Sequence, residues 1–500
     1  METKGKDASS AETMLDDETV IRKKTKMTSD LKGVIRKIEG LAELLALGFV
    51  YYIIWKSYYR GSATPNFLGN GKYVLLLVYV FLMLILFYMC DGFKYGHRKL
   101  SEVIVSQWIS IVLVNFVTYF QLCLIGNKML NAWPVLGLTI IDFFVAAVMS
   151  YIFSLIYHQM YVPKEMLLIY GNEKGIDLKF KMDERPDKYV ITKVLSYEVD
   201  FEVIKDEIKK HDAVIINDVP AEIRNDILKY CYKHEVRTYV VPKISDIIQR
   251  GGEEINLFDT PLYLIKGRGL NPVQAFIKRA FDIVLSLIVM IPGILIMAVV
   301  AVAIKLEDHG SVFYKQERVT KDGKVFNIIK FRSMIENAEK DGKSQPAIDN
   351  DPRITKVGKV IRATRIDELP QVLNILKGDM SWVGPRPERT EHVEYFLEEI
   401  PEFEFRYKVK GGLTGYAQIY GRYNTSAYDK LRLDLMYIEN YSFFLDLKLI
   451  LMTVQIIFKK ESTAGFDNTD ELEKKRYEMI NELGETEVAA TTLPINNSVR

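Results

Sequence analysis

The feature that most constrains the fold is a series of apolar stretches suited to crossing a lipid bilayer. Four of them lie in the first third of the chain, at 41–55, 73–90, 103–125 and 134–157. A hydrocarbon layer about 30 Å thick needs about 20 apolar helical residues, and the last three stretches approach that length. The first is shorter and contains Glu43, so its helix is expected to begin earlier, near Ile35; an interfacial helix is the alternative. We therefore predict four transmembrane helices within 35–160.

Basic residues around these stretches predict their orientation. Lysines and arginines are frequent at 22–37, before the first stretch, and Lys94, Arg98 and Lys99 follow the second, whereas the loop after the third holds only Lys128. Because lysine and arginine favour the cytoplasmic side, both the N-terminus and the chain after the fourth helix are expected in the cytoplasm. The polar leader 1–34 is predicted to be disordered and is not typical of a signal peptide.

The overall composition says little, because the net charge is +1 and the mean hydropathy near zero averages very apolar and very polar segments. The three cysteines, Cys90, Cys123 and Cys231, have no spacing typical of a disulfide framework or a zinc site, so reduced thiols are expected. No nucleic-acid partner is expected.

The segment 161–268 changes to short apolar runs that alternate with amphipathic helical ones. The runs MLLIYG, AVIIND and RTYVVP are separated by KDEIKK and AEIRNDILKYCYKH, a pattern typical of a small parallel α/β module of Rossmann-like fold. The turn after the first run, from Gly171 to Gly175, lacks the GxGxxG spacing of a dinucleotide loop. We expect a cofactor-free structural or interaction module; a nucleotide-binding domain is the alternative.

A fifth apolar run covers 281–305 and is interrupted by Pro292 and Gly293. A kinked spanning helix is one interpretation, since membrane helices tolerate proline. We prefer a re-entrant helix that bends at Pro292, because proline removes a helical hydrogen bond there and because a full crossing would carry the downstream chain away from cytosolic nucleotide sugars. A last apolar run ending at Phe458 contains Asp446 and Lys448 and predicts an interfacial amphipathic helix. The tail 467–500 is polar.

The region between the fifth and the last run is rich in residues suited to phosphate. Its arginines and lysines are Lys330 and Arg332 in KFRS, Arg353, Lys356, Arg362 and Arg365 in DPRITKVGKVIRATR, and Arg386 and Arg389 in VGPRPER. Arginine matches phosphate oxygens geometrically, and lysine adds a point charge. Contact with anionic lipid heads is the alternative, and we prefer it for Lys356 and Arg389.

Two adjacent carboxylates, Asp367 and Glu368, lie among these cations. The apolar residues that follow recur at helical spacing: Leu369, Val372, Leu373 and Leu376. Pro370 suits a first helical turn and Gly378 a helix end, so the carboxylates are expected at a helix N-terminus, where a phosphate can also bind. An ordinary N-cap is the alternative. A carboxylate can attack phosphorus to form an acyl phosphate, and Mg²⁺ held by such oxygens would neutralise a diphosphate.

Several long motifs together resemble the bacterial sugar transferase family, the polyprenyl-phosphate hexose-1-phosphate transferases or monotopic phosphoglycosyl transferases. These motifs are KFRSM, IRATRIDELPQVLNILKGDMSWVGPRPE, GLTGYAQIYGR and YDKLRLDLMYIENYS, and they follow the proline-broken run. The resemblance covers about 271–466, and the preceding parts resemble the large subclass of the family. It implies a mostly α-helical monotopic catalytic domain at 269–466 with a re-entrant membrane helix at 281–305.

The resemblance also implies roles for individual residues. Asp367 matches the family's nucleophile and Glu368 its partner, both close to Mg²⁺. The substrate-binding positions that it implies are Lys330, Arg332, Arg362, Pro385, Arg386, Pro387 and Arg422. One departure is Ile291, where family members often have a small hydroxyl residue before the proline.

The expected reaction moves a hexose 1-phosphate from a UDP-sugar to undecaprenyl phosphate and releases UMP. It would begin the assembly of an exopolysaccharide, capsule or O-antigen-type glycan at the bacterial inner membrane, with the catalytic domain facing the cytoplasm and the enzyme a homodimer. One alternative is a glycosyltransferase that cleaves the sugar C1–O bond and releases UDP. Another is a non-catalytic membrane scaffold of polysaccharide export.

Overall fold

A computed structural model describes residues 33–62, 70–160, 163–336, 338, 351–421, 425–457, 474 and 478. The leader before residue 33 and nearly all of the predicted tail lie outside the described residues. Contacts within the chain separate it into two compact units, Met1–Val162 and Pro163–Arg500. Each unit is described by itself.

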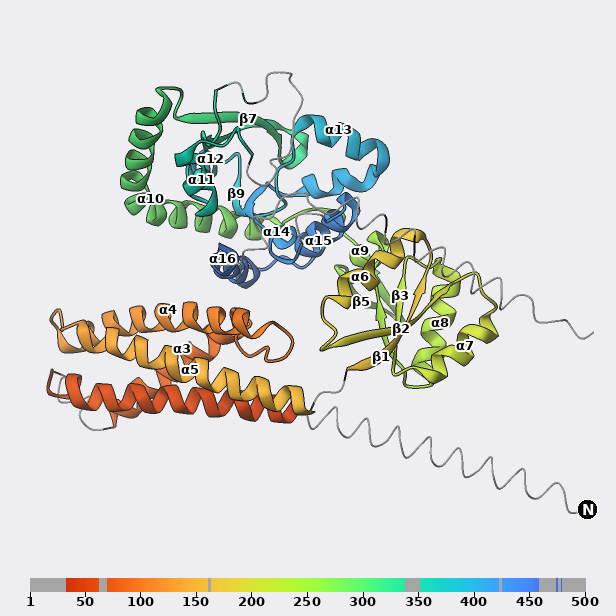
Figure 1. Cartoon of the computed structure of the whole chain (residues 1–500), viewed down its shortest axis with the longest axis horizontal. Helices are drawn as coiled ribbons and strands as arrows, with labels where there is room; N and C mark the ends of the chain where they lie inside the picture. The colour runs from red at the N-terminus through yellow and green to blue at the C-terminus, as the bar shows by residue number, and fades with distance from the viewer. Residues whose placement is uncertain are drawn as a thin grey trace, which may run out of the picture. The chain divides into compact units, whose positions relative to one another are not determined.

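The first unit consists of four long helices (Figure 1). They are Gly33–Tyr59, α3 (Gly71–Met89), α4 (Leu100–Gly126) and α5 (Trp133–Met160). The first begins before Ile35, as its sequence predicts; it ends in a π-helical turn, η1 (Trp55–Tyr59), followed by the short η2 (Arg60–Ser62). All four are long and apolar enough to cross a membrane.

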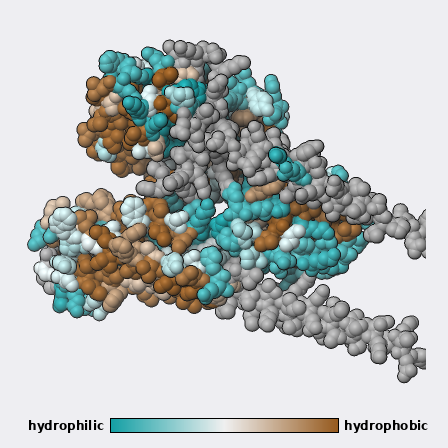
Figure 2. Space-filling view, in the orientation of Figure 1, coloured by the Kyte–Doolittle hydropathy of each residue, from teal (hydrophilic) through white to brown (hydrophobic). Residues whose placement is uncertain are grey.

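The interior of this helical unit holds aromatic and polar side chains beside aliphatic ones, and further apolar side chains face outward. The rings of Tyr51 and Tyr79 stack with centroids 4.2 Å apart. Asp142 is fully buried and accepts hydrogen bonds from the Tyr79 hydroxyl at 2.7 Å and the Asn115 amide at 3.1 Å. Hydrophobic side chains cover much of the visible outer surface of these helices (Figure 2). This arrangement suits a lipid surrounding, in which polar groups must be satisfied inside the protein.

The second unit begins with a four-stranded parallel sheet in the order β2-β1-β3-β4. Its strands are β1 (Lys164–Tyr170), β2 (Tyr189–Ser196), β3 (Ala213–Asn217) and β4 (Arg237–Val240). The connecting helices are η3 (Glu173–Ile176), α6 (Asp177–Asp183), α7 (Phe201–Lys210), α8 (Ala221–Lys233) and α9 (Ile244–Arg250). Every residue of β3 is buried, as expected for a strand covered on both faces. An antiparallel hairpin, β5 (Glu253–Leu257) and β6 (Thr260–Leu264), follows.

The fifth apolar run lies in α10 (Pro272–Asp308), which begins at an Asn271 capping box and contains Pro292. Its ribbon changes direction part-way along its length (Figure 1). Both arms contact the same domain. In the first arm Lys278 pairs with Asp446 of α16 (Phe443–Ile457) at 2.6 Å, and in the second Val300 and Ile304 pack against Phe331 and Ile361.

The remaining elements of this domain follow α10 in the chain. They are β7 (Phe313–Val319), η4 (Lys321–Gly323), β8 (Val325–Phe331), α11 (Lys356–Ala363), η5 (Ile366–Glu368), α12 (Gln371–Lys377), β9 (Ser381–Val383), α13 (Thr390–Glu399), η6 (Pro401–Lys408), β10 (Gly412–Thr414), α14 (Tyr416–Tyr420) and α15 (Ala427–Glu439). A core of apolar residues from α9, α15, α16 and η6 includes Phe403, Leu435 and Leu449. Asp446, one of the two charges in the last apolar run, is buried and pairs with Lys278.

Candidate active site

Three chain segments bring one carboxylate and two cations together. Glu368 lies in η5, Lys330 near the end of β8, and Arg386 in the segment after β9. The Glu368 Oε1 atom accepts a hydrogen bond from Lys330 Nζ at 3.1 Å and another from the Arg386 guanidinium at 2.7 Å. Its side chain is only 13% exposed. Glu368 therefore joins the three segments, and its hydrogen bonds to Lys330 and Arg386 fix its orientation.

Local backbone geometry places the carboxylates directly before α12. Arg365 adopts a left-handed conformation, with φ of 58°, and turns the chain from α11 into η5. Pro370 precedes α12, and Gly378 ends it with φ of 100°, a conformation that glycine adopts without a Cβ clash. The helix after the carboxylates and its end at Gly378 are as predicted. Helix α12 has only seven residues. The cations around the carboxylate pair, rather than the end of this helix, therefore dominate the electrostatics at the pair.

The two carboxyl groups differ in their electrostatic surroundings. Burial acts to raise the pKa of Glu368, but Arg386 and Lys330 outweigh it and hold that pKa far below its ordinary value. Burial and the charge of Glu368 raise the pKa of Asp367, and Lys330 and Arg362 oppose that rise. Asp367 Oδ1 is buried and, among the residues that the structure describes, has no hydrogen-bond partner. Glu368 is thus a fixed anion, and Asp367 keeps an oxygen available for chemistry.

Comparisons with known proteins identify the family of the region that holds these residues. The model of the bacterial sugar transferase family matches residues 273–460. The uncharacterized sugar transferase EpsL of Bacillus subtilis is 37% identical over 201 residues, which cover 40% of this chain and 95% of that protein. The chain belongs to the bacterial sugar transferase family. The matched range agrees with the 271–466 predicted from its motifs.

Two longer relatives carry more specific names. The UDP-N-acetylgalactosamine-undecaprenyl-phosphate N-acetylgalactosaminephosphotransferase of Aeromonas hydrophila is 39% identical over 259 residues, covering 50% of this chain and 59% of the relative. The UDP-glucose:undecaprenyl-phosphate glucose-1-phosphate transferase of Klebsiella pneumoniae is 40% identical over 254 residues, covering 49% and 51%. The chain therefore spans little more than half the length of these relatives.

In this family member, Arg332 has partners away from the carboxylates. Its guanidinium donates to Asp308 at the end of α10, with one bond at 2.6 Å, and to the Ser311 carbonyl at 2.6 Å. Its side chain is 8% exposed. Arg332 thus ties the second arm of α10 to β8, and its predicted contact with substrate stays a prediction.

The segment Pro385-Arg386-Pro387 is anchored on both sides of its arginine. The Pro385 carbonyl accepts a hydrogen bond from the Gly412 amide at 2.9 Å, and the Pro387 carbonyl accepts one from Arg318 at 3.1 Å. These anchors present the Arg386 side chain to Glu368. Direct contact of the prolines with a nucleotide sugar stays a prediction, and Arg422 lies outside the described residues.

Arg318 of β7 is a cation that the sequence analysis did not single out. Burial and the neighbouring Arg386 lower its pKa to about 10, and its Nε is buried without a hydrogen-bond partner within the described part of the chain. Its place beside Arg386 comes from the pairing of β7 with β8 and from the Pro387 contact. No local motif indicates either contact.

The residues present fit a hard divalent cation. No cluster of three or more metal-ligating side chains occurs within the described ranges. Mg²⁺, however, is commonly held by one or two carboxylates, with substrate phosphates and water completing its shell. Asp367 and Glu368, with the unpaired Oδ1 of Asp367, supply such a donor set.

Proposed function

We propose that the chain transfers a hexose 1-phosphate from a UDP-sugar to undecaprenyl phosphate and releases UMP. The observation that carries this proposal is the carboxylate of Asp367, whose Oδ1 has no hydrogen-bond partner among the described residues, next to an anion held by two cations. Such a site can attack a phosphorus atom and stabilise the charge that develops on it. The names of the relatives, which include sugar phosphotransferases acting on undecaprenyl phosphate, support the substrate class.

The reaction has two displacements at one phosphorus atom. In the first, Asp367 attacks the phosphorus bonded to the sugar, its new O–P bond forms, and the bond to UMP breaks, so that UMP leaves with the bonding electron pair. In the second, a phosphate oxygen of undecaprenyl phosphate attacks the same phosphorus. The bond to Asp367 then breaks, which regenerates the carboxylate and gives undecaprenyl-diphosphate sugar.

The surrounding residues have complementary roles in this scheme. Lys330 and Arg386 orient Glu368 and supply positive charge beside the reacting phosphoryl group, and Arg362 adds charge near Asp367. Asp367 and Glu368 would hold Mg²⁺, which when bound neutralises diphosphate charge and so favours the approach of an anionic nucleophile. Asp367 attacks as the carboxylate; burial and the charge of Glu368 raise its pKa, whereas Lys330 and Arg362 favour the charged form.

The membrane arrangement is part of the proposal. The four helices of the first unit cross the bacterial inner membrane as a bundle, and the Rossmann-like module and catalytic domain, within a homodimer, face the cytoplasm, where UDP-sugars are found. Helix α10 enters the bilayer and returns at Pro292. A straight helix of 37 residues would span about 55 Å. The attachment of both arms to one domain supports a bend instead.

The test is product analysis with a panel of UDP-sugars, because relatives carry glucose, galactose and N-acetylgalactosamine in their names. We expect UMP release and, without lipid acceptor, a phosphosugar adduct on Asp367 detected by intact mass. Asp367→Asn should abolish both, since an amide is a poor nucleophile. Asp379→Asn, an isosteric change just after α12, is the matched control and should retain both.

Other outcomes are equally informative. Release of UDP would favour a glycosyltransferase that cleaves the sugar C1–O bond, and no turnover with any UDP-sugar would favour a membrane scaffold. Asp367→Asn with more than a few per cent of wild-type turnover would remove Asp367 as the nucleophile.

A further inference from the structure

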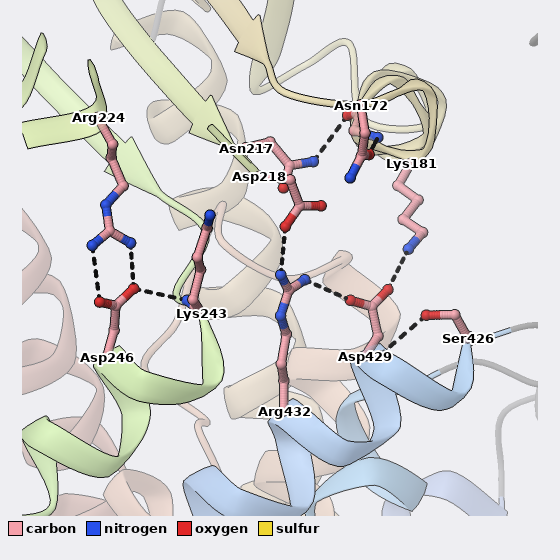
Figure 3. Close-up of polar contacts among 11 residues, drawn as sticks. Asn172, Lys181, Asn217, Asp218, Arg224, Lys243, Asp246, Ser426, Asp429 and Arg432 are labelled. Carbon is pink, nitrogen blue, oxygen red and sulfur yellow. Dashed lines mark hydrogen bonds and ion pairs between the residues drawn. The ribbon is translucent and has the colours of Figure 1, made fainter. Parts of the chain in front are cut away.

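The strand order of the α/β module has a topological switch point, the position at which parallel sheets of its kind usually bind ligands in a crevice. β1 and β3 are neighbours, and the chain leaves them toward opposite edges of the sheet, to β2 and β4. Ligands of doubly wound sheets bind at the carboxyl ends of two such strands. Here Gly171 and Asn172 follow β1, and Asp218 follows β3 (Figure 3).

The two loops at this crevice pack closely and are bonded to each other. A Cβ on Gly171 would lie 2.1 Å from the Asp218 carbonyl oxygen. The Asn217 side chain donates to the Gly175 carbonyl at 2.9 Å, and the Asn172 side chain accepts from the Gly175 amide at 2.9 Å. Gly171 is therefore needed for close packing of the loops, which explains its presence without a bound nucleotide.

An arginine of the catalytic domain lies against this edge of the sheet. Arg432 of α15 donates to Asp218 at 2.7 Å and to Asp429 at 3.1 Å, and its guanidinium stacks on the Tyr428 ring at 4.2 Å. Lys181 of α6 reaches Asp429 from the module at 3.3 Å (Figure 3). Two cations and two carboxylates balance in charge, so the cluster is suited to joining the two parts and offers no net charge to an anion.

The Asp218–Arg432 pair is well sheltered. The side chain of Arg432 is 8% exposed and that of Asp218 is 19% exposed. Asp218 has a left-handed backbone, with φ of 56°, a conformation that aspartate tolerates better than most residues. Removing one partner of a sheltered ion pair destabilises a protein more than removing one partner of an exposed pair.

Apolar contacts hold α15 against the module as well. Ile244 and Ile247 of α9 belong to the same buried core as Leu431 and Leu435 of α15. Helix α9 is in turn fixed to α8 by the pair of Arg224 and Asp246, with two contacts of 2.5 and 3.0 Å (Figure 3). The module therefore supports α15 through both charge and packing.

The opposite face of α15 leads to the active site. Asp434 is two residues beyond Arg432, which corresponds to a rotation of about 200° around the helix. Asp434, only 1% exposed, pairs with Arg406 at 2.7 Å. Arg406 donates to the Arg386 carbonyl at 2.8 Å, and Arg386 donates to Glu368 at 2.7 Å. A continuous set of contacts thus connects the module to the carboxylate pair.

We propose that Asp218 and Arg432 are positioning residues of the transferase. The module holds α15 at the crevice and, through Asp434 and Arg406, fixes the segment that orients Arg386 toward Glu368. The crevice is then a docking site for a helix of the same chain. This role in turnover rests on the proposed function, but the structural coupling does not.

The test compares Asp218→Asn with Asp187→Asn in the full-length protein in membranes or nanodiscs. Asp187 also pairs with an arginine, Arg185 at 2.8 Å, but that pair lies wholly within the module. We expect Asp218→Asn to lower kcat by about 2- to 30-fold, the range of couplings carried by such networks, with little change in KM for the UDP-sugar. Asp218→Glu keeps the charge on a longer side chain at a left-handed position, so it should restore part of kcat, and Asp187→Asn should match wild type.

A double variant and a second measurement make the test specific. Asp218→Asn combined with Arg432→Gln should lower kcat no further than Arg432→Gln alone, because each substitution breaks the Asp218–Arg432 pair. In the same samples, hydrogen exchange in peptides covering 366–377 should rise for Asp218→Asn and not for Asp187→Asn. Rates are expressed per folded protein, determined from thermal unfolding.

The outcomes separate this proposal from the proposed function. Unchanged exchange in 366–377, or additive effects of the two substitutions, would overturn the positioning role whatever the turnover. A change in KM with kcat constant would overturn it in favour of a substrate-contacting crevice. If wild type releases no UMP while the exchange still rises in Asp218→Asn, the proposed function fails and the coupling stands.

Discussion

Substituting Lys330 by methionine should change both the rate and its pH dependence. Lys330 Nζ lies 3.1 Å from Glu368 Oε1, and the two side chains are 18% and 13% exposed. At that distance the Coulomb attraction is about 5 kcal/mol with an effective dielectric constant of about 20, before the cost of desolvation. Methionine keeps much of the chain's volume and removes the charge.

Two consequences follow for catalysis. Loss of a preorganised cation beside the phosphoryl group should lower kcat by about 10²- to 10³-fold, the effect typical of removing one stabilising donor. Lys330 also opposes the raised pKa of Asp367. Removing the Lys330 charge should therefore raise the pKa of Asp367 further. Because Asp367 attacks only as the carboxylate, the acid limb of the pH profile should move to higher pH.

The assay is UMP release measured as kcat/KM from acidic to neutral pH, which reports the free enzyme. Lys377→Met is the control, because Lys377 lies at the exposed end of α12 with a side chain 76% exposed. It should leave the profile unchanged. An acid limb of Lys330→Met that coincides with wild type, or lies at lower pH, would refute the electrostatic reasoning.

Two further predictions concern other parts of the chain. Replacing Pro292 and Gly293 by leucine should straighten α10, since an internal proline costs about 3 kcal/mol in an uninterrupted helix. Impermeant labelling of single cysteines placed just before Phe281 and after Lys305 should then place the two sites on opposite sides of the membrane in some molecules. In wild type both sites should label from one side. The α/β module should bind no NAD, because its glycine loop is packed against the Asp218 carbonyl; saturable low-micromolar binding in calorimetry of the full-length protein would contradict this.

The carboxylate pair was predictable because its signals are local. Asp367, Glu368, Pro370 and Gly378 lie within a dozen residues, and proline and glycine act on backbone geometry directly. The four long N-terminal helices were predictable for a similar reason, since length and hydropathy are properties of a single segment. In these cases the sequence indicates both the element and its approximate limits.

Ion pairs between distant segments were not predictable in this way. Arg432 and Asp218 are separated by 214 residues, and Arg406 meets the Arg386 carbonyl through a fold that no periodicity encodes. Arg332 illustrates the difficulty, because its motif marks it as a phosphate ligand while its side chain pairs with Asp308. Charge in a motif identifies a cation but leaves its partner open.

Polar attachments away from the residue before Pro292 support the bend in α10. Ile291 offers no hydroxyl to the backbone at the break. The first arm is instead held by Lys278 with Asp446 and by Asp282, which accepts from Ser381 at 2.9 Å. The second arm is held through Asp308 and Arg332. Because these polar attachments lie on both sides of Pro292 and end on one domain, removing a single hydrogen bond at the break would leave its direction determined by the domain.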